Sequence, residues 1–228
     1  MSPDGVGTRR SVSPMAPPGV YAPQEDTELL AGALSDEPVP PDATVLDVGT
    51  GSGALAVAAA RRGCRVTAVD VSWRAVGTAR LNALRAGVPV RVRRGDLFGP
   101  VRGESFDLVL ANPPYVPAPG GPSLPRGAAR AWDAGADGRL VLDRICWEAP
   151  ALLRPGGVLL LVQSALSGPE LTVGHLRAAG TKAAVIRRRH ISFGPVLRAR
   201  ESWLRARGLL TAADDKEELV VIRAELPV

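Results

Sequence analysis

Strand-like and helix-like segments alternate along most of this chain, and that alternation is the feature that most limits how it can fold. Short runs rich in valine, leucine and alanine are separated by segments with helical periodicity and by turns that contain glycine or proline. Strands are expected at 44–49, 65–70, 90–96, 106–113, 157–164, 182–190 and 217–226, and helices at 25–34, 54–62, 73–87, 137–153 and 169–179. This pattern predicts a parallel sheet covered by helices on both faces.

The last two strands depart from that alternation. Between them only the short segment 202–208 has helical character, and it is too short to serve as a crossover helix. We therefore expect these two strands to pair in antiparallel fashion at one edge of the sheet. The predicted fold class is α/β, with a doubly wound, mostly parallel seven-stranded sheet of the Rossmann-like kind and an antiparallel edge pair.

The beginning of the chain has a different composition from the rest. Residues 1–18 are rich in proline, glycine and serine and show no hydrophobic periodicity, which predicts a disordered or loosely attached tail. Residues 19–228 are expected to form a single domain. The start has no signal-peptide pattern, and no run of about 18 uncharged apolar residues occurs, so we expect a soluble cytoplasmic protein with no membrane partner.

The chain is basic, with 28 Lys and Arg against 23 Asp and Glu and a formal net charge of +5. Basic residues cluster at Arg91–Arg94 and Arg187–His190. These clusters are either solvated strand ends or part of a groove for an anionic substrate or a ribosome-associated partner. The two cysteines, Cys64 and Cys146, have apolar or helical neighbours, so we interpret them as core residues and expect no metal site.

A glycine-rich turn follows the first predicted strand, at the edge where doubly wound sheets bind their ligands. Its glycines would let the backbone turn sharply and approach a ligand closely. The spacing G-x-G-x-G differs from the dinucleotide fingerprint G-x-G-x-x-G, which argues against NAD. The cofactor-binding candidates here are Asp47, Gly49, Thr50, Gly51 and Gly53.

Acidic residues end the next two predicted strands. Asp70, followed by Val71, stands where a carboxylate can accept hydrogen bonds from a ribose diol, although it could also cap the following helix. Asp96 could accept from an adenine amine while Leu97 or Phe98 covers the ring. Together with the glycine-rich turn, these residues predict an adenosine pocket.

The fourth predicted strand ends in the sequence Asn112-Pro113-Pro114-Tyr115. Prolines terminate a strand because they lack an N–H and restrict the preceding residue, but strand termination does not explain the asparagine or the tyrosine. At this motif the chain resembles class I S-adenosylmethionine-dependent methyltransferases, whose amine- and amide-methylating members carry [D/N]-P-P-[Y/F/W]. The resemblance implies S-adenosyl-L-methionine as the cofactor and one methyltransferase domain over residues 19–228.

Two further segments narrow the resemblance. Tyr21–Leu30 and Ala131–Ile145 are similar to the short HemK-like glutamine methyltransferases, which lack the helical N-terminal domain of the bacterial release-factor enzymes. The resemblance covers roughly residues 20–165. It departs from the family at Trp132–Gly138, which is unusually rich in alanine. It implies a protein substrate with a glutamine loop like that of a release factor, and a small zinc-binding activator subunit as a partner.

The same resemblance implies roles for the motif. The Asn112 side-chain oxygen and the Pro113 carbonyl would accept the two N–H bonds of the acceptor nitrogen, and Tyr115 would stack on its planar group, so these three are the catalytic candidates. Asn112 is also a cofactor-binding candidate.

Thr27, with Glu25 and Asp26, stands where similar enzymes fold a segment over the cofactor, which makes Thr27 a cofactor-binding candidate. The alternative is that these residues form an ordinary acidic first turn of a helix. Trp132 would either line the acceptor entrance or anchor its loop.

Three other functions stay open at this stage. The same clamp would serve an exocyclic amine of an RNA or DNA base after base flipping, or a small molecule of a biosynthetic pathway. The chain is only 4% aromatic, and we expect no room for a separate recognition domain, so nucleic acid is the less favoured partner. A non-catalytic binding protein with the same fold is disfavoured because Asp70 and Asn112 are both present.

Overall fold

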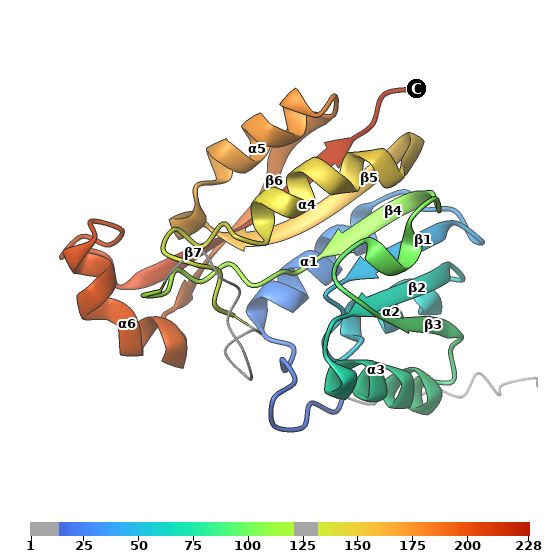
Figure 1. The fold of residues 1–228 in the computed structure, drawn as a ribbon, viewed down its shortest axis with the longest axis horizontal. Helices are drawn as coiled ribbons and strands as arrows, with labels where there is room; N and C mark the ends of the chain where they lie inside the picture. Colours follow the sequence, from blue (N-terminus) through green and yellow to red (C-terminus); the bar gives the residue numbers. More distant parts are fainter. Residues whose placement is uncertain (1–13, 121–131) are drawn as a thin grey trace, which may run out of the picture.

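The computed structural model describes residues 14–120 and 132–228. Its described part contains one seven-stranded sheet with the strand order β3-β2-β1-β4-β5-β7-β6 (Figure 1). The strands are β1 Thr44–Val48, β2 Arg65–Asp70, β3 Val90–Arg94, β4 Phe106–Ala111, β5 Leu153–Ser164, β6 Lys182–Ser192 and β7 Lys216–Glu225. Strands β1 to β5 pair in parallel, and β7 runs antiparallel to both β5 and β6. The predicted fold class is confirmed.

Helices cover both faces of this sheet. The α-helices are α1 Glu25–Asp36, α2 Ala54–Arg61, α3 Trp73–Ala86, α4 Leu142–Glu148, α5 Pro169–Ala178 and α6 Pro195–Ala206. Helices α1, α2 and α3 pack in succession on one face, while α4 packs against α5 on the other (Figure 1). Short 3₁₀ turns are η1 Gly99–Val101, η3 Ala149–Leu152 and η4 Ala165–Ser167.

The central strands are buried on both faces, which explains their continuous apolar sequence. In β4, Leu108–Ala111 are all fully buried, and the neighbouring β5 residues Leu159–Val162 are buried with them. Cys64 and Cys146 lie in this core, as predicted. Because β1, β2, β3 and β4 are parallel, their carboxyl ends meet at one edge of the sheet, and the residues that follow them are brought together there.

Two predicted elements need correction. The helix expected at 137–153 is shorter, because Pro150 interrupts it and β5 already begins at Leu153. A full helix, α6, stands where only 202–208 had helical character. Helix α6 buries Leu197 and Leu204 in a second small cluster with Phe193 and Leu210. It lies beyond the end of the sheet and does not cover a face of it, so it does not act as a crossover helix, and β6 and β7 can pair in antiparallel fashion (Figure 1).

The predicted tail is only partly described, since residues 1–13 lie outside the described residues. Within 14–18, the Met15 N–H donates to the Asn82 side-chain oxygen at 3.0 Å, and the Asn82 amide donates back to the Met15 carbonyl at 2.8 Å. These bonds attach the segment to α3. In the described part of the chain, no helix combines the length and the apolar character needed to cross a bilayer.

Candidate functional site

A cavity of about 800 Å³ opens at the carboxyl edge of the sheet. Its size is in the range of small-molecule and cofactor sites. Its walls come from the segments that follow β1, β2, β3 and β4, from the start of α1 and from one side of α4. Of the predicted site residues, those that line it are Thr27, Gly49, Thr50, Gly51, Asp70, Val71, Asp96, Leu97, Asn112, Pro113 and Tyr115.

The first wall is the glycine-rich turn, which is joined to the end of β2 by hydrogen bonds. The Gly51 N–H donates to one carboxylate oxygen of Asp70 at 3.0 Å, and the Ser72 N–H donates to the other at 2.8 Å. Gly51 has a φ of +54°, a backbone conformation that favours glycine. Asp70 therefore fixes the turn and the start of α3 against each other while facing the cavity.

Two predicted cofactor residues stand behind that turn and do not line the cavity. Asp47 is fully buried and accepts from the Thr50 hydroxyl at 2.5 Å and from the Ala56 N–H at 3.0 Å. Burial raises the pKa of Asp47 to about 6. Gly53 has a φ of +82°, and a Cβ there would lie 3.0 Å from Ala79 of α3. Both residues support the turn and the helix packing.

The next part of the cavity wall is the segment that follows β3. Asp96 lines the cavity, and its carboxylate also forms an ion pair at 2.9 Å with Arg144 of α4, which lines the cavity as well. Leu97 has a φ of +41°, which is uncommon for a residue with a side chain. Arg144 is a cavity residue that the sequence did not predict, because its position on a later helix gives no sign of this contact.

The Asn112–Tyr115 motif, at the end of β4, forms another part of the cavity wall. Tyr115 is almost fully buried, and its hydroxyl donates to the Asp26 carboxylate at 3.0 Å. The Tyr21 hydroxyl donates to the same oxygen of Asp26 at 2.7 Å. Burial, with the neighbouring Asp26, raises the pKa of both tyrosines, so both hydroxyls keep their protons and act as donors.

The start of α1 also contacts the asparagine of the motif. The Asn112 amide nitrogen donates to the Thr27 hydroxyl at 3.3 Å, and that hydroxyl donates to the second oxygen of Asp26 at 3.1 Å. Glu25, in contrast, is exposed and does not line the cavity. The sequence placed this segment over the cofactor, but its contact with Asn112, 85 residues away, was missed because no local pattern reports it.

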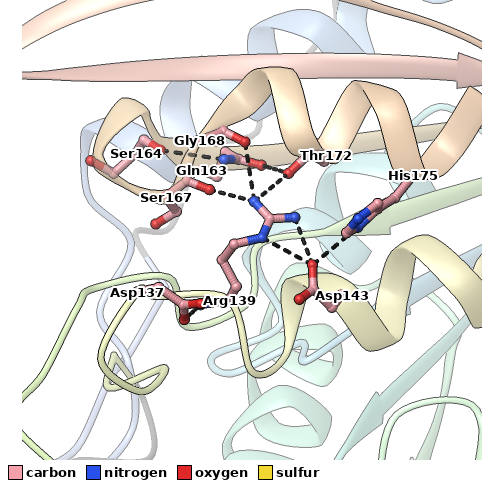
Figure 2. Close-up of polar contacts among 9 residues, drawn as sticks. All are labelled: Asp137, Arg139, Asp143, Gln163, Ser164, Ser167, Gly168, Thr172 and His175. Atoms are coloured by element: carbon pink, nitrogen blue, oxygen red, sulfur yellow. Dashed lines mark hydrogen bonds and ion pairs between the residues drawn. The ribbon is translucent and has the colours of Figure 1, made fainter.

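A polar network centred on Arg139 joins the loop before α4 to the turn between β5 and α5 (Figure 2). The buried Arg139 guanidinium donates to the Ser167 carbonyl, to the Thr172 hydroxyl at 3.1 Å and to Asp143 at 2.6 Å. The Ser167 hydroxyl donates in turn to the Tyr115 carbonyl at 2.6 Å. This network fixes the loop that follows the motif against the turn between β5 and α5.

That support leaves no room for a side chain at Gly138. A Cβ there would lie 2.4 Å from the Tyr115 carbonyl oxygen and 2.6 Å from the Ser167 hydroxyl, and the φ of +75° also favours glycine. Trp132 lines the cavity, and its carbonyl accepts from the Val116 N–H at 2.9 Å. Trp132 therefore both faces the cavity and anchors its loop, which the sequence analysis had treated as alternatives.

The basic stretch on β6 is occupied by surface ion pairs. Arg187 pairs with Asp36 of α1, and Arg188 pairs with Glu218 of β7 at 2.8 Å. Neither this stretch nor Arg91–Arg94 lines the cavity. These contacts fit solvated strand ends.

Comparison with known proteins points to one kind of chemistry. The family model called methyltransferase small domain matches residues 14–120. A putative protein N5-glutamine methyltransferase of Methanocaldococcus jannaschii is 36% identical over 177 residues, which cover 77% of this chain and 88% of that protein. The release factor glutamine methyltransferase of Deinococcus radiodurans is 39% identical over 192 residues, which cover 81% of this chain but only 66% of that longer protein.

A solved structure shares the fold. The structure of the E. cuniculi Mtq2–Trm112 complex, which is responsible for methylation of the translation termination factor eRF1, matches with a TM-score of 0.63 and 24% identity. The match covers 91% of this chain and 99% of the compared chain. At this identity the likeness concerns the fold.

Proposed function

The chain belongs to the class I S-adenosylmethionine-dependent methyltransferases of the HemK-like type, and on that premise we propose that its acceptor is a glutamine side-chain amide in a protein such as a translation release factor. The observation that carries the proposal is the position of Asn112, Pro113 and Tyr115, which together line the cavity that the glycine-rich turn and Asp70 also line. The names of the archaeal and bacterial relatives support the choice of glutamine.

The cavity fits S-adenosylmethionine. Asp70 would accept from the ribose hydroxyls, Asp96 from the adenine amine, and Gly49 and Gly51 would allow close approach of the backbone. Val71 and Leu97 would flank the adenosine. When bound, the cofactor supplies an electrophilic methyl group on a sulfonium.

The acceptor nitrogen is a poor nucleophile, because the lone pair of an amide is delocalised into its carbonyl. The Asn112 side-chain oxygen and the Pro113 carbonyl would accept its two N–H bonds, which turns the nitrogen toward the methyl group and favours the positive charge that it acquires. Tyr115, held by Asp26 and by Ser167, would pack against the planar amide. No general base is needed before transfer, because the proton leaves only after the nitrogen has become cationic.

The partner and the site of action belong to the same proposal. The solved structure that shares the fold is a two-protein complex, and the sequence resemblance implies a small zinc-binding activator subunit. We propose that this chain also works with such a subunit, in the cytoplasm where translation factors are available. Full turnover by the purified chain alone would show that no activator is required.

The acceptor is tested by offering labelled S-adenosylmethionine with a purified release factor and, in separate reactions, with ribosomal RNA and with small amines. We expect label in the release factor. Label only in RNA, or only in a small metabolite, would contradict a glutamine acceptor while leaving the methyltransferase assignment in place. Asn112→Ala is the matched control, since it should bind the cofactor but transfer the methyl group about 100-fold more slowly or worse.

A further inference from the structure

We propose that Asp26 and Thr27 are positioning residues that determine which end of the Asn112 side-chain amide faces the methyl acceptor. The inference rests on the proposed function, in which the Asn112 oxygen accepts an acceptor N–H. It gives the first turn of α1 a part in acceptor recognition, in addition to any contact with the cofactor.

An asparagine amide has two ends of almost the same shape but opposite hydrogen-bonding character. If the oxygen faces the acceptor, it accepts the N–H of the nitrogen to be methylated. If the NH₂ group faces the acceptor, a donor meets a donor and the clamp repels its substrate. Packing alone distinguishes the two orientations poorly, so the choice must come from a hydrogen-bond partner on the other side of Asn112.

Asp26 begins the chain of hydrogen bonds that makes this choice. It is only 3% exposed, and as a carboxylate it can only accept. Among the described residues it accepts four hydrogen bonds, from the Tyr21 and Tyr115 hydroxyls on one oxygen and from the Thr27 N–H at 2.5 Å and hydroxyl at 3.1 Å on the other. The backbone N–H cannot reverse its role, so the oxygen beside Thr27 is fixed as an acceptor.

Thr27 passes that direction on to Asn112. A hydroxyl has one proton, and Thr27 gives its proton to Asp26, so toward Asn112 it can offer only a lone pair. The contact of 3.3 Å between Thr27 and Asn112 is therefore satisfied only by the amide nitrogen. The amide oxygen is left for a ligand, which is the orientation that methyl transfer to a nitrogen requires.

Asp26 thereby acts on two members of the clamp. It orients Asn112 through Thr27, and it holds the Tyr115 hydroxyl directly. Within the described residues the Asp26 carboxylate forms no ion pair and accepts hydrogen bonds from four donors, so its removal would release several groups at once. Thr27 is therefore the cleaner position for a test.

The first variant is Thr27→Val, which keeps the shape of the side chain and removes the hydroxyl. We expect kcat/KM for the acceptor to fall about tenfold, which corresponds to the loss of one hydrogen bond of ordinary strength. Binding of S-adenosylhomocysteine, measured by calorimetry, should change much less than this. Thr27→Ser, which retains the hydroxyl, should recover most of the activity. An undiminished rate in Thr27→Val would overturn the proposal.

The decisive comparison repeats Thr27→Val in an Asn112→Asp background. A carboxylate has two equivalent oxygens, so either orientation presents an acceptor to the substrate. In this background Thr27→Val should therefore lower kcat/KM by less than about twofold. An equal loss in both backgrounds would mean that Thr27 acts in some other way. The acceptor used is whichever one the wild-type protein methylates, so an error in the proposed substrate does not affect the result.

A measurement without turnover covers the case in which Asn112→Asp is inactive. In the nitrogen-15 spectrum of the ligand-free protein, the side-chain NH₂ protons of Asn112 should exchange slowly with solvent because Thr27 holds one of them. Thr27→Val should speed that exchange at least severalfold. Fast exchange in the wild-type protein, or the same exchange in both proteins, would mean that the NH₂ group faces the cavity and would overturn the proposal.

Discussion

Replacing Glu217 by glutamine is expected to stabilise the protein most above about pH 7 and to have much less effect in acid. Glu217 is the second residue of β7. It is 7% exposed, and its buried Oε1 has no hydrogen-bond partner in the described structure. Its pKa is raised to about 7, mainly by burial and in smaller part by the nearby carboxylates of Asp26 and Glu25, while a hydrogen bond with Ser164 acts in the opposite direction.

The sign of the pH dependence follows from that direction. Since the pKa of Glu217 is higher in the native state than its usual value of 4.5, the folded protein favours the protonated form. Its stabilising contribution is complete below about pH 4.5 and is lost as the pH rises through about 7. The difference between the two pKa values corresponds to about 3 kcal/mol in the free energy of unfolding. Glutamine stays neutral throughout and still accepts from Ser164.

The assay is urea unfolding, followed by circular dichroism, at pH 5 and at pH 8. Glu217→Gln should raise the free energy of unfolding by up to about 3 kcal/mol at pH 8 and by much less at pH 5. The control is Glu218→Gln, which removes a partly exposed ion pair to Arg188 and should cost less than about 1 kcal/mol. A destabilised Glu217→Gln at pH 8, or the same change at both pH values, would refute this reasoning.

Three other substitutions test separate parts of the site. Asp70→Ala should weaken binding of S-adenosylhomocysteine by about 1–3 kcal/mol in calorimetry, and unchanged affinity would contradict the ribose assignment. Ser167→Ala removes the donor to the Tyr115 carbonyl and should reduce kcat severalfold with little change in cofactor affinity; steady-state rates equal to wild type would mean that the motif does not depend on this support. Gly53→Ala places a Cβ 3.0 Å from Ala79 at a positive φ and should lower the thermal midpoint, whereas an unchanged midpoint would show that α2 and α3 adjust without cost.

The fold was largely predictable because its signals are local. Each of these signals lies within a few consecutive residues: the continuous apolar runs predict β1, β4 and β5, and a glycine marks the end of α3. Helix α6 was missed because its apolar side chains, Leu197 and Leu204, serve a small separate cluster and do not cover the sheet, so the usual link between a crossover helix and a parallel strand does not apply.

The site was predictable where residues follow strand ends and unpredictable where distant side chains meet. The parallel strands brought Asp70, Asp96 and Asn112 to one cavity as expected. The bond between Tyr115 and Asp26 joins positions 89 residues apart, and the support of the motif by Ser167 spans 52 residues. Such contacts depend on how complete elements pack, which no short motif encodes.

The claim that Asn112–Tyr115 holds a protein amide for methylation is tested most directly by finding where the methyl group goes. A release factor treated with the enzyme and S-adenosylmethionine is digested, and fragmentation mass spectrometry assigns the methylated atom. We predict methylation of a glutamine side-chain nitrogen, with a loss of about 100-fold or more in Asn112→Ala while cofactor affinity stays close to that of the wild type. A methyl group on another kind of side chain, or undiminished transfer by Asn112→Ala, would contradict the account.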